Sequence, residues 1–397
     1  MKKVYLDHSA TTPLDREVLQ DMIPYFCDEF GNANSMHAFG QAGAQAVDGA
    51  RRKIASLIGA KPNEIYFTSG GTEADNWAIK GMARKMKGKR SKIITSAIEH
   101  AAIMSSCKQM ENEGFTTVYL PVDEYGVVKE DEFIKQLTPD TALVSIMLAN
   151  NEIGTIQPIK RLAELAHEKG IYFHTDAVQA VGSIKVNVNE LGVDLMSFSA
   201  HKFYGPKGIG VIYIRGGVKP DKFMTGGHQE RTMRGGTTNV PAVVGMASAL
   251  ERAVNKLDEN YEYVKSLRDR FVNRVMDEIP SVIYNGHPSQ RLPQNANFAF
   301  EYIEGESILM LLDLEGIACS SGSACSSGSL EPSHVLLATG LPIERAHGSI
   351  RFSFGKGNTV EEVDYTVEKL KQIVEKLRKM SPLYSEKVGI KCTTKKY

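Results

Sequence analysis

Two strand ends in the middle of the chain place a lysine and a carboxylate where a ligand could meet both. Ser199-Ala200-His201-Lys202 follows a predicted strand and precedes a glycine-rich turn, residues 205–208. Upstream, Asp176 ends the predicted strand 171–175. Open α/β sheets bind ligands at the carboxyl ends of their strands, so we expect the two groups in one site. A lone lysine is usually a solvated surface charge, and the interpretation therefore depends on its neighbours.

These residue types suit the chemistry of pyridoxal phosphate (PLP). The cofactor needs an amine that forms a Schiff base, for which Lys202 is the candidate. It also needs a carboxylate, here Asp176, that keeps the pyridine nitrogen protonated so that the ring accepts electrons. Gln179 could donate a hydrogen bond near the ring oxygen, and the flat side chain of His100 could cover the ring.

Glycine turns supply candidate donors for the cofactor phosphate. Ser69-Gly70-Gly71 joins a strand to a helix that begins near Thr72, and the N–H groups at a helix start attract anions. Gly-Gly turns are common, however, and Thr72 is equally an N-cap facing Asp75. Further donors are expected from Ser199, His201 and the cluster Arg234-Gly235-Gly236-Thr237.

A cysteine lies in a Gly/Ser-rich stretch, residues 319–332, that has almost no apolar anchor. This composition predicts a flexible loop, which suits a thiolate nucleophile at Cys325. Cys319 is a rival nucleophile, expected to be semi-buried at the root of the loop. Free cysteines are more often buried and inert, and this remains the interpretation for Cys27, Cys107 and Cys392.

The elements that must position these residues change in character along the chain. Continuous apolar strands alternate with helix-period segments from about residue 41 to 215, which predicts a mostly parallel sheet covered on both faces. After Pro241 a long helical stretch runs to about Ile279, and short strands and helices follow. We expect an α/β fold with a large domain, 15–255, and a smaller α+β domain, 1–14 with 256–397, that carries the cysteine loop.

The predicted strands of the large domain are 64–68, 92–95, 117–120, 142–147, 171–175 and 210–214, with a helix at 159–169. In the smaller domain, strands are predicted at 297–300 and 350–354, and helices at 307–315 and 359–379. The last helix carries an apolar stripe at steps of three and four residues, so it should pack on one face.

Composition excludes several classes of protein. The 397 residues are 42% hydrophobic and 24% charged, as in globular proteins, and 47 basic residues balance 47 acidic ones, so no net field favours nucleic acid or membrane. No apolar run approaches the ~20 residues of a membrane helix, and the N-terminus lacks the apolar region of a signal peptide. The five cysteines form no Cys-x-x-Cys pair, which argues against zinc ribbons and disulfide frameworks. We therefore expect a reducing, cytoplasmic location.

Taken together, these motifs resemble one family. The chain is similar to the cysteine desulfurases of the NifS and IscS kind, in the class-V aminotransferase group of fold-type-I PLP enzymes, over nearly its whole length. The matching segments are 5–13, 68–73, 99–100, 150–154, the Asp176 and Lys202 segments, and 351–353.

The resemblance implies the removal of sulfur from L-cysteine, which leaves L-alanine and a persulfide on Cys325, the last residue of the motif 320–325. The implied catalytic residues are Cys325, Lys202 and His100, with the Schiff base on Lys202. Cofactor contacts are implied for Gly71, Thr72, His100, Asn151, Asp176, Gln179, Ser199, Ala200, His201, Lys202 and, from the neighbouring subunit of a homodimer, Thr237. Substrate contacts are implied for Asn151 and Arg351.

The resemblance also implies a mechanism and partners. Arg351 would hold the substrate carboxylate in a two-pronged contact, Lys202 would remove the Cα proton, and His100 would move protons near the substrate thiol. A scaffold resembling NifU or IscU would accept the sulfur for iron–sulfur clusters, with Cys325 as a transient iron–sulfur ligand through its persulfide. The wording of 320–334 is nearer the nitrogen-fixation branch, while general cluster assembly and tRNA thiolation stay open.

Three alternatives remain. A PLP lyase or aminotransferase of the same fold could act on another amino acid, such as selenocysteine. A non-enzymatic metal or iron–sulfur protein could use Cys319, Cys325 and His334, although their spacing matches no standard site. A nicotinamide enzyme is disfavoured because Gly70-Gly71-Thr72 lacks the Gly-x-Gly-x-x-Gly spacing.

Overall fold

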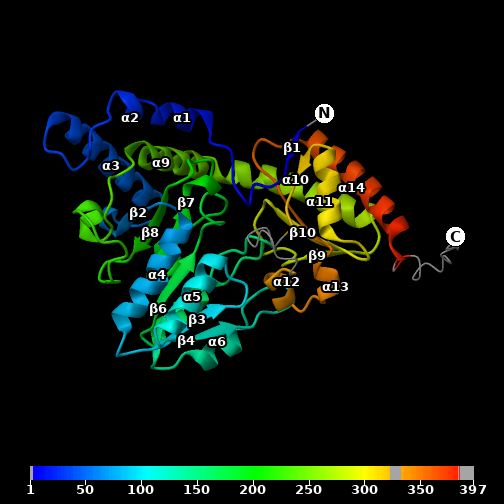
Figure 1. Cartoon of the computed structure of the whole chain (residues 1–397), viewed down its shortest axis with the longest axis horizontal. Coiled ribbons are helices and arrows are strands. Elements are labelled where there is room, and N and C mark those ends of the chain that lie inside the picture. Colours follow the sequence, from blue (N-terminus) through cyan, green and yellow to red (C-terminus); the bar gives the residue numbers. More distant parts are fainter. Residues whose placement is uncertain (1–2, 322–331, 383, 385–397) are drawn as a thin grey trace, which may run out of the picture.

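The structure is a computed structural model that describes residues 3–321, 332–382 and 384. Its central feature is a seven-stranded sheet in the order β2-β8-β7-β6-β5-β3-β4 (Figure 1). All neighbouring strands are parallel except β8, which is antiparallel to both β2 and β7. The strands are β2 Ile65–Thr68, β3 Lys92–Ser96, β4 Thr116–Leu120, β5 Thr141–Ser145, β6 Tyr172–Asp176, β7 Leu195–Ser199 and β8 Gly210–Ile214. The predicted mostly parallel sheet is confirmed.

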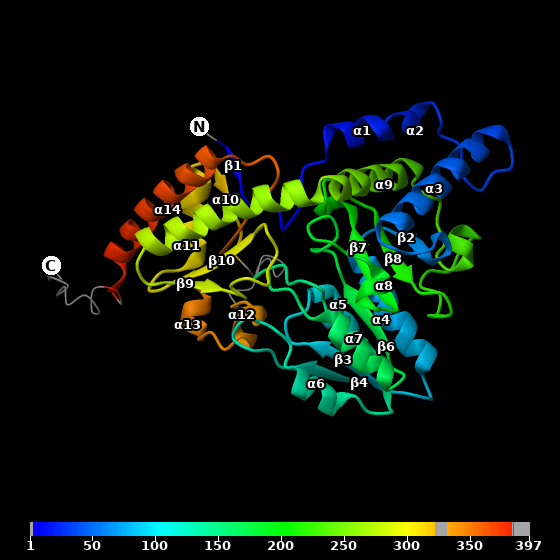
Figure 2. The ribbon, with the colours of Figure 1, turned by 180° about the vertical axis from the view of Figure 1, so that it is seen from behind.

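Helices cover both faces of this sheet, because its strands are apolar on both sides. Neighbouring residues of β3 illustrate the alternation: Ile93 packs in the core beneath α4 and α5, and Ile94 in the core beneath α3, α7 and α9. Figure 2 shows the second group from the opposite side of the molecule. The helices are α3 Ala38–Leu57, α4 Gly71–Met86, α5 Ala101–Asn112, α7 Ile159–Glu168 and α9 Val240–Asn255.

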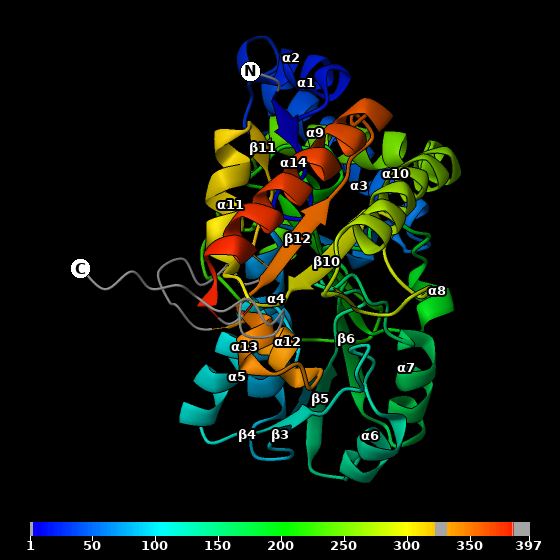
Figure 3. The same ribbon diagram turned by 90° about the vertical axis from the view of Figure 1, so that its right-hand side faces the viewer.

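A second, antiparallel sheet of order β12-β10-β9 has a core of its own (Figure 3). The ring of Phe271 lies 4.7 Å from that of Phe352 and 6.0 Å from that of Phe298. Two short strands, β1 and β11, pair in parallel beside it. The elements of this part are β1 Val4–Tyr5, α10 Leu257–Glu278, β9 Val282–Asn285, β10 Asn295–Phe300, α11 Gly305–Leu314, β11 Ile317–Ala318, β12 Ser349–Ser353 and α14 Val360–Met380.

Short helices complete the description: α1 Arg16–Met22, α2 Pro24–Cys27, η1 Pro62–Glu64, α6 Glu130–Gln136, α8 Val188–Leu191, η2 Ala200–Lys202, η3 Gln229–Thr232, α12 His334–Ala338 and α13 Ile343–Ala346. Across the described ranges, each of these helices is too short or too polar to cross a membrane, as are the longer ones.

Three local expectations need correction. The helical stretch after Pro241 is two helices, α9 and α10, because Lys256 leaves helical geometry with φ −114° and ψ 22°. Thr72 is not an N-cap, since α4 already begins at Gly71, and Asp75 is buried in the helix rather than exposed at a cap. Cys27 is exposed at the end of α2 instead of being buried, whereas Cys107 is buried as expected.

Candidate active site at the carboxyl edge of the sheet

A cavity of about 290 Å³ opens where β2, β6 and β7 end, and it gathers most of the residues singled out from the sequence. The turns after these strands contribute the walls, as the topology of a parallel sheet requires. The predicted residues that line the cavity are Gly71, Thr72, His100, Asn151, Asp176, Gln179, Ser199, His201, Lys202 and Arg351.

Lys202 reaches the cavity from η2, the turn that follows β7. Its Nζ donates hydrogen bonds to two backbone carbonyls of the N-terminal segment, Ser9 O at 2.5 Å and Ala10 O at 2.9 Å. Gln179 Nε2 also donates to Ser9 O, at 2.9 Å, which commits one of its two N–H groups. Ser9 and Ala10 therefore form a wall of the cavity that sequence reasoning missed, although segment 5–13 was among the matching motifs.

Asp176 ends β6 and is buried, with Oδ1 accepting a hydrogen bond from Val178 N at 2.8 Å. Burial raises the pKa of Asp176, and the nearby His100 and Lys202 lower it. A buried carboxylate is stabilised by a cation placed against it. A protonated pyridine nitrogen is such a cation, so Asp176 fits the ring of PLP.

The start of α4 fits a phosphate group. Sixteen residues of helix begin at Gly71, directly after the turn that follows β2, so the first N–H groups point out of the helix end. A Cβ at Gly71 would lie 2.7 Å from Val178 Cγ2, which shows how tightly this wall is built. Ser199 and His201 face the same cavity. Burial lowers the pKa of His201 to about 4, and the neutral ring still donates one N–H.

His100 is the N-cap residue of α5, and its hydrogen bond there indicates which ring nitrogen carries the proton. Nδ1 accepts a hydrogen bond from Ala102 N at 3.1 Å, which assigns the ring proton to Nε2. Because the ring lines the cavity, Nε2 is the atom that can exchange a proton with a bound molecule.

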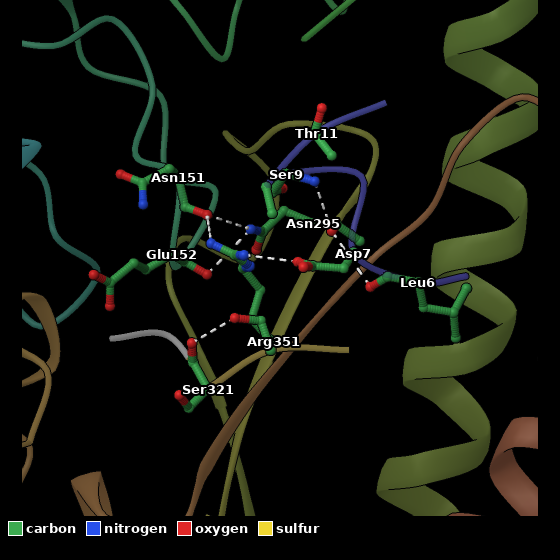
Figure 4. Close-up of polar contacts among 12 residues, drawn as sticks. Leu6, Asp7, Ser9, Thr11, Asn151, Glu152, Asn295, Ser321 and Arg351 are labelled. Atoms are coloured by element: carbon green, nitrogen blue, oxygen red, sulfur yellow. Dashed lines mark hydrogen bonds and ion pairs between the residues drawn. The ribbon is translucent and has the colours of Figure 1, made fainter. Parts of the chain in front are cut away.

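Arg351 on β12 is 3% exposed and its guanidinium is held at two points (Figure 4). Nη2 donates to Asp7 Oδ1 at 2.8 Å, and Nη1 donates to the carbonyl of Asn151 at 3.1 Å. Its Nε–H is buried and has no hydrogen-bond partner within the described part of the chain. Asp7 was not predicted, because its partner is 344 residues away in the sequence.

On both sides of the cysteine segment, residues 319–332, described residues are hydrogen-bonded to residues beside this cavity. Ser320 and Arg351 exchange backbone hydrogen bonds of 2.7 Å and 3.1 Å. On the other side, Ser333 Oγ donates to Glu152 Oε2 at 2.5 Å, and His334 Nε2 lies 3.0 Å from the carbonyl of Glu99. Cys325 itself lies outside the described residues.

The rival thiol, Cys319, is partly buried against the core of the smaller sheet, as expected for the root of the loop. Burial raises the pKa of this thiol far above its ordinary value, and Asp7 adds to the effect. A thiol with a raised pKa is rarely ionised at neutral pH, and it is therefore a poor nucleophile. Burial likewise raises the pKa of Cys107 to about 12.

Some predicted residues are not brought to the cavity. Ala200 is fully buried and its N–H donates to Ile209 O at 3.2 Å. Arg234 Nε pairs with Glu73 Oε1 at 2.8 Å, so this guanidinium braces the first turn of α4. Thr237 is exposed and lies outside the cavity formed by its own chain. Among the residues that the structure describes, no three His, Cys, Asp or Glu side chains are arranged to hold a metal ion.

A second cavity, of about 400 Å³, lies on the α9–α10 side of Lys202 and shares Gln179 with the first. Two of its lining cations are already matched by carboxylates: Lys356 Nζ lies 2.5 Å from Asp15 Oδ2, and Arg252 pairs with Glu17. This cavity therefore lacks the convergent donor set found around Asp176, and we place the chemistry in the smaller one.

Comparison with known proteins gives a consistent result. A model of the class-V aminotransferase family, which is PLP-dependent, matches residues 4–366. The chain is 53% identical to a cysteine desulfurase IscS of Methanosarcina thermophila, over 96% of this chain and 94% of that protein, and 54% identical to one of Dictyoglomus turgidum, over 97% and 98%. A solved NifS-like protein superposes with a TM-score of 0.90 at 40% identity, over 95% of this chain and 100% of the other. The chain therefore belongs to the class-V aminotransferase family, and within it to the cysteine desulfurases of the IscS kind.

Proposed function

We propose that this chain is a PLP-dependent cysteine desulfurase, which converts L-cysteine to L-alanine and receives the sulfur on Cys325. One observation carries the proposal: Lys202, Asp176 and Arg351 line a single cavity. They provide an amine for the cofactor aldehyde, a carboxylate for its ring nitrogen and a guanidinium for the substrate carboxylate. The bound cofactor supplies an electron sink for the carbanion formed at the substrate Cα.

The residues around the cavity divide the remaining work. Arg351 holds the substrate carboxylate through charge-assisted hydrogen bonds and so fixes the Cα–H bond for cleavage. Lys202 takes the proton from Cα. His100, with its proton on Nε2, moves protons to and from the substrate thiol. Gly71, Thr72, Ser199 and His201 hold the phosphate, and Asn151 and Gln179 border the ring.

The sulfur step balances without an added oxidant or reductant. The Cys325 thiolate attacks the substrate sulfur, so an S–S bond forms while the substrate C–S bond breaks. The carbon fragment keeps the electron pair of the broken bond and takes up a proton to become alanine. The sum of the step is cysteine plus a thiol giving alanine plus a persulfide.

The raised pKa of Cys319 supports Cys325 as the nucleophile, because burial keeps the thiol at position 319 protonated. The described residues on both sides of Cys325, Ser320 and Ser333, are bonded to Arg351 and Glu152 beside the cavity. A segment anchored at these two points starts and ends next to the proposed substrate site.

We further propose that the persulfide passes to a scaffold of the NifU or IscU kind for iron–sulfur cluster assembly, where Cys325 would serve as a transient cluster ligand. A link to nitrogenase and a cytoplasmic location remain proposals from the sequence, as does the division into a large domain, 15–255, and a smaller domain, 1–14 with 256–397. The separate cores of the two sheets support that division.

We propose a homodimer in which Thr237 completes the phosphate site of the neighbouring subunit. Two observations support it. Thr237 is exposed and lies outside its own cavity. Large apolar side chains are exposed along residues 23–39, which is unusual for a surface in water: Ile23, Phe26, Phe30, Met36 and Phe39, with the rings of Phe30 and Phe39 5.8 Å apart.

The function is tested with two variants and a matched control. Lys202→Ala should lose the visible absorption of bound cofactor and all turnover, and borohydride reduction of the parent should label Lys202. Cys325→Ser should keep the absorption but form no persulfide, while Cys319→Ser should form persulfide at nearly the parental rate. Parental rates of alanine and sulfide release from Cys325→Ser would reject the assigned nucleophile. Competition between cysteine and selenocysteine would separate the two substrates.

A further inference from the structure

A second carboxyl group, Asp75, lies in the same cavity as Asp176 and has no role in the proposed reaction. It belongs to the first turns of α4, is 1% exposed, and lines the cavity. Its Oδ1 accepts no hydrogen bond from any described residue. An ionised carboxylate left without donors in such a place is costly, so its protonation state needs an explanation.

The sheet beneath α4 carries a row of polar side chains that meets Asp75. Ser145 pairs in register with His174, and Asp176 pairs in register with Ser197. Side chains alternate along a strand, so His174 and Asp176 lie on one face, together with their register partners. This is the face of Leu143 and Leu195, which pack in the core beneath α4.

Three of these side chains, Ser145, His174 and Ser197, form a hydrogen-bonded chain that passes beside Asp75. Ser145 Oγ lies 2.8 Å from His174 Nδ1, and His174 Nε2 lies 2.9 Å from Ser197 Oγ. Asp75 lies next to this chain, with its Oδ1 3.8 Å from His174 Nε2, which is beyond hydrogen-bond distance. Burial lowers the pKa of His174 to about 3, so the imidazole is neutral and carries one N–H.

The chain satisfies itself without a proton from Asp75. The neutral imidazole of His174 donates its one N–H to one serine hydroxyl and accepts a hydrogen bond from the other. Asp75 Oδ1 receives no hydrogen bond from the described residues that would stabilise a negative charge there.

The surroundings indicate which of the two carboxyl groups, Asp75 or Asp176, holds a proton. Burial raises the pKa of Asp75 most, the neighbouring carboxyl groups of Asp176 and Glu99 raise it further, and Ser197 opposes this rise only in part. The neighbouring His100 and Lys202, by contrast, lower the pKa of Asp176, which also receives the N–H of Val178. Two carboxylates in one buried site rarely ionise together. The proton of the pair therefore belongs on Asp75 and the negative charge on Asp176.

We propose that Asp75 is a positioning residue of the cofactor site: a protonated, uncharged acid that lies beside the chain of Ser145, His174 and Ser197, in the same cavity as Asp176. This leaves Asp176 to carry the negative charge that faces the ring nitrogen. The identity of that ring rests on the proposed function, whereas the proton on Asp75 is a property of the protein alone.

The proton is tested by infrared spectroscopy of the full chain without cofactor, since a protonated carboxyl absorbs apart from a carboxylate. Asp75→Asn should remove one protonated-carboxyl band. Glu99→Gln and Glu152→Gln are matched controls: each should remove a different band, one that titrates in the parent with the pKa of about 8 or about 7 raised by burial. If Asp75→Asn removes a carboxylate signal and no protonated-carboxyl band, the proposal is overturned.

The positioning role is tested by cofactor binding. Asparagine imitates the protonated acid in shape and charge, so Asp75→Asn should bind PLP within about twofold of the parent, while Asp176→Asn, which loses a charge-assisted contact, should bind about tenfold or more weakly. Asp75→Leu removes the polar group from this wall of the cavity and should shift the pH at which the bound cofactor changes colour. Equal damage from Asp75→Asn and Asp176→Asn would contradict the role. If even the parent fails to bind PLP, the proposed function fails, and the infrared result still stands.

Discussion

The residue with the most demanding environment is Arg351, because its guanidinium is buried and already bonded to Asp7 and to Asn151 O. A substrate carboxylate must use the donors that remain, and only the planar fork of arginine offers several in fixed geometry. We predict that Arg351→Lys raises KM for cysteine by about tenfold or more, which corresponds to about 1.5–3 kcal/mol for a charged hydrogen bond. Steady-state alanine formation measures it.

Arg345→Lys is the control for this prediction, because Arg345 is a half-exposed side chain whose Nε lies 2.9 Å from Glu301 Oε1, and it should leave KM unchanged. If Arg351→Lys lowers kcat while KM stays at the parental value, Arg351 does not hold the substrate in its ground state.

Residue identities could be predicted where the chemistry needs a particular side chain. Lys202, Asp176 and His100 were found because an amine, a carboxylate and an imidazole end predicted strands or begin helices in matching motifs. Asp7, Ser9 and Asp75 were missed because their roles come from tertiary contacts. A signal for the last was present: polar residues alternate in strand 172–176, with His174 and Asp176 on one face of an otherwise apolar sheet.

At the scale of elements, the phosphate turn depends on how closely β8 approaches it. A Cβ at Gly210 would lie 2.6 Å from the backbone carbon of Gly70, and backbone cannot move aside as a flexible side chain can. We predict that Gly210→Ala displaces the start of α4 and weakens PLP binding about tenfold, or about 1.4 kcal/mol. Titration of cofactor fluorescence or absorption measures it.

Gly49→Ala is the matched control, because a Cβ there meets nothing within 4 Å and alanine favours the helix α3. Its cofactor affinity should equal that of the parent. Parental affinity of Gly210→Ala as well would show that the turn tolerates displacement.

Helices and strands could be predicted where the local sequence pattern was strong. Apolar runs predicted the bounds of six of the seven strands of the large sheet, because a strand with both faces buried reads as continuous apolar residues. The seventh, β7, was expected before Ser199 but was given no bounds. The strands β1, β9 and β11 were missed because they are two to four residues long. In addition, β1 and β11 pair with each other although they are far apart in the sequence. The break at Lys256 escaped detection because no proline or glycine marks it.

At the scale of the whole molecule, the segment 23–39, which exposes Ile23, Phe26, Phe30, Met36 and Phe39, runs from α2 into α3 at the end away from the small sheet (Figures 1 and 2). We predict that Phe30→Asp, which charges a side chain that is 65% exposed, converts a dimer to monomers in sedimentation experiments. Leu314→Asp, at an equally exposed position on α11, should remain dimeric. A dimer that survives Phe30→Asp would place the interface elsewhere.

Mixed dimers extend this prediction to the site. If Thr237 acts across the interface, a dimer of one Lys202→Ala subunit and one Thr237→Ala subunit should contain one intact site. In that site, the first subunit supplies Thr237 and the second supplies Lys202. Activity recovered on mixing, relative to either variant alone, supports that arrangement. Mixtures no more active than the separate variants would mean that Thr237 serves its own chain.

The contacts of the N-terminal segment, residues 4–9, have a consequence for the time during translation at which the active site forms. Val4 pairs with Ile317, Asp7 bonds to Arg351, and the carbonyl of Ser9 receives Lys202. The contacts with Ile317 and Arg351 can form only after nearly the whole polypeptide has left the ribosome. A nascent chain can therefore complete its large sheet while one wall of the active-site cavity is still missing. The enzyme should stay inactive until translation is almost finished.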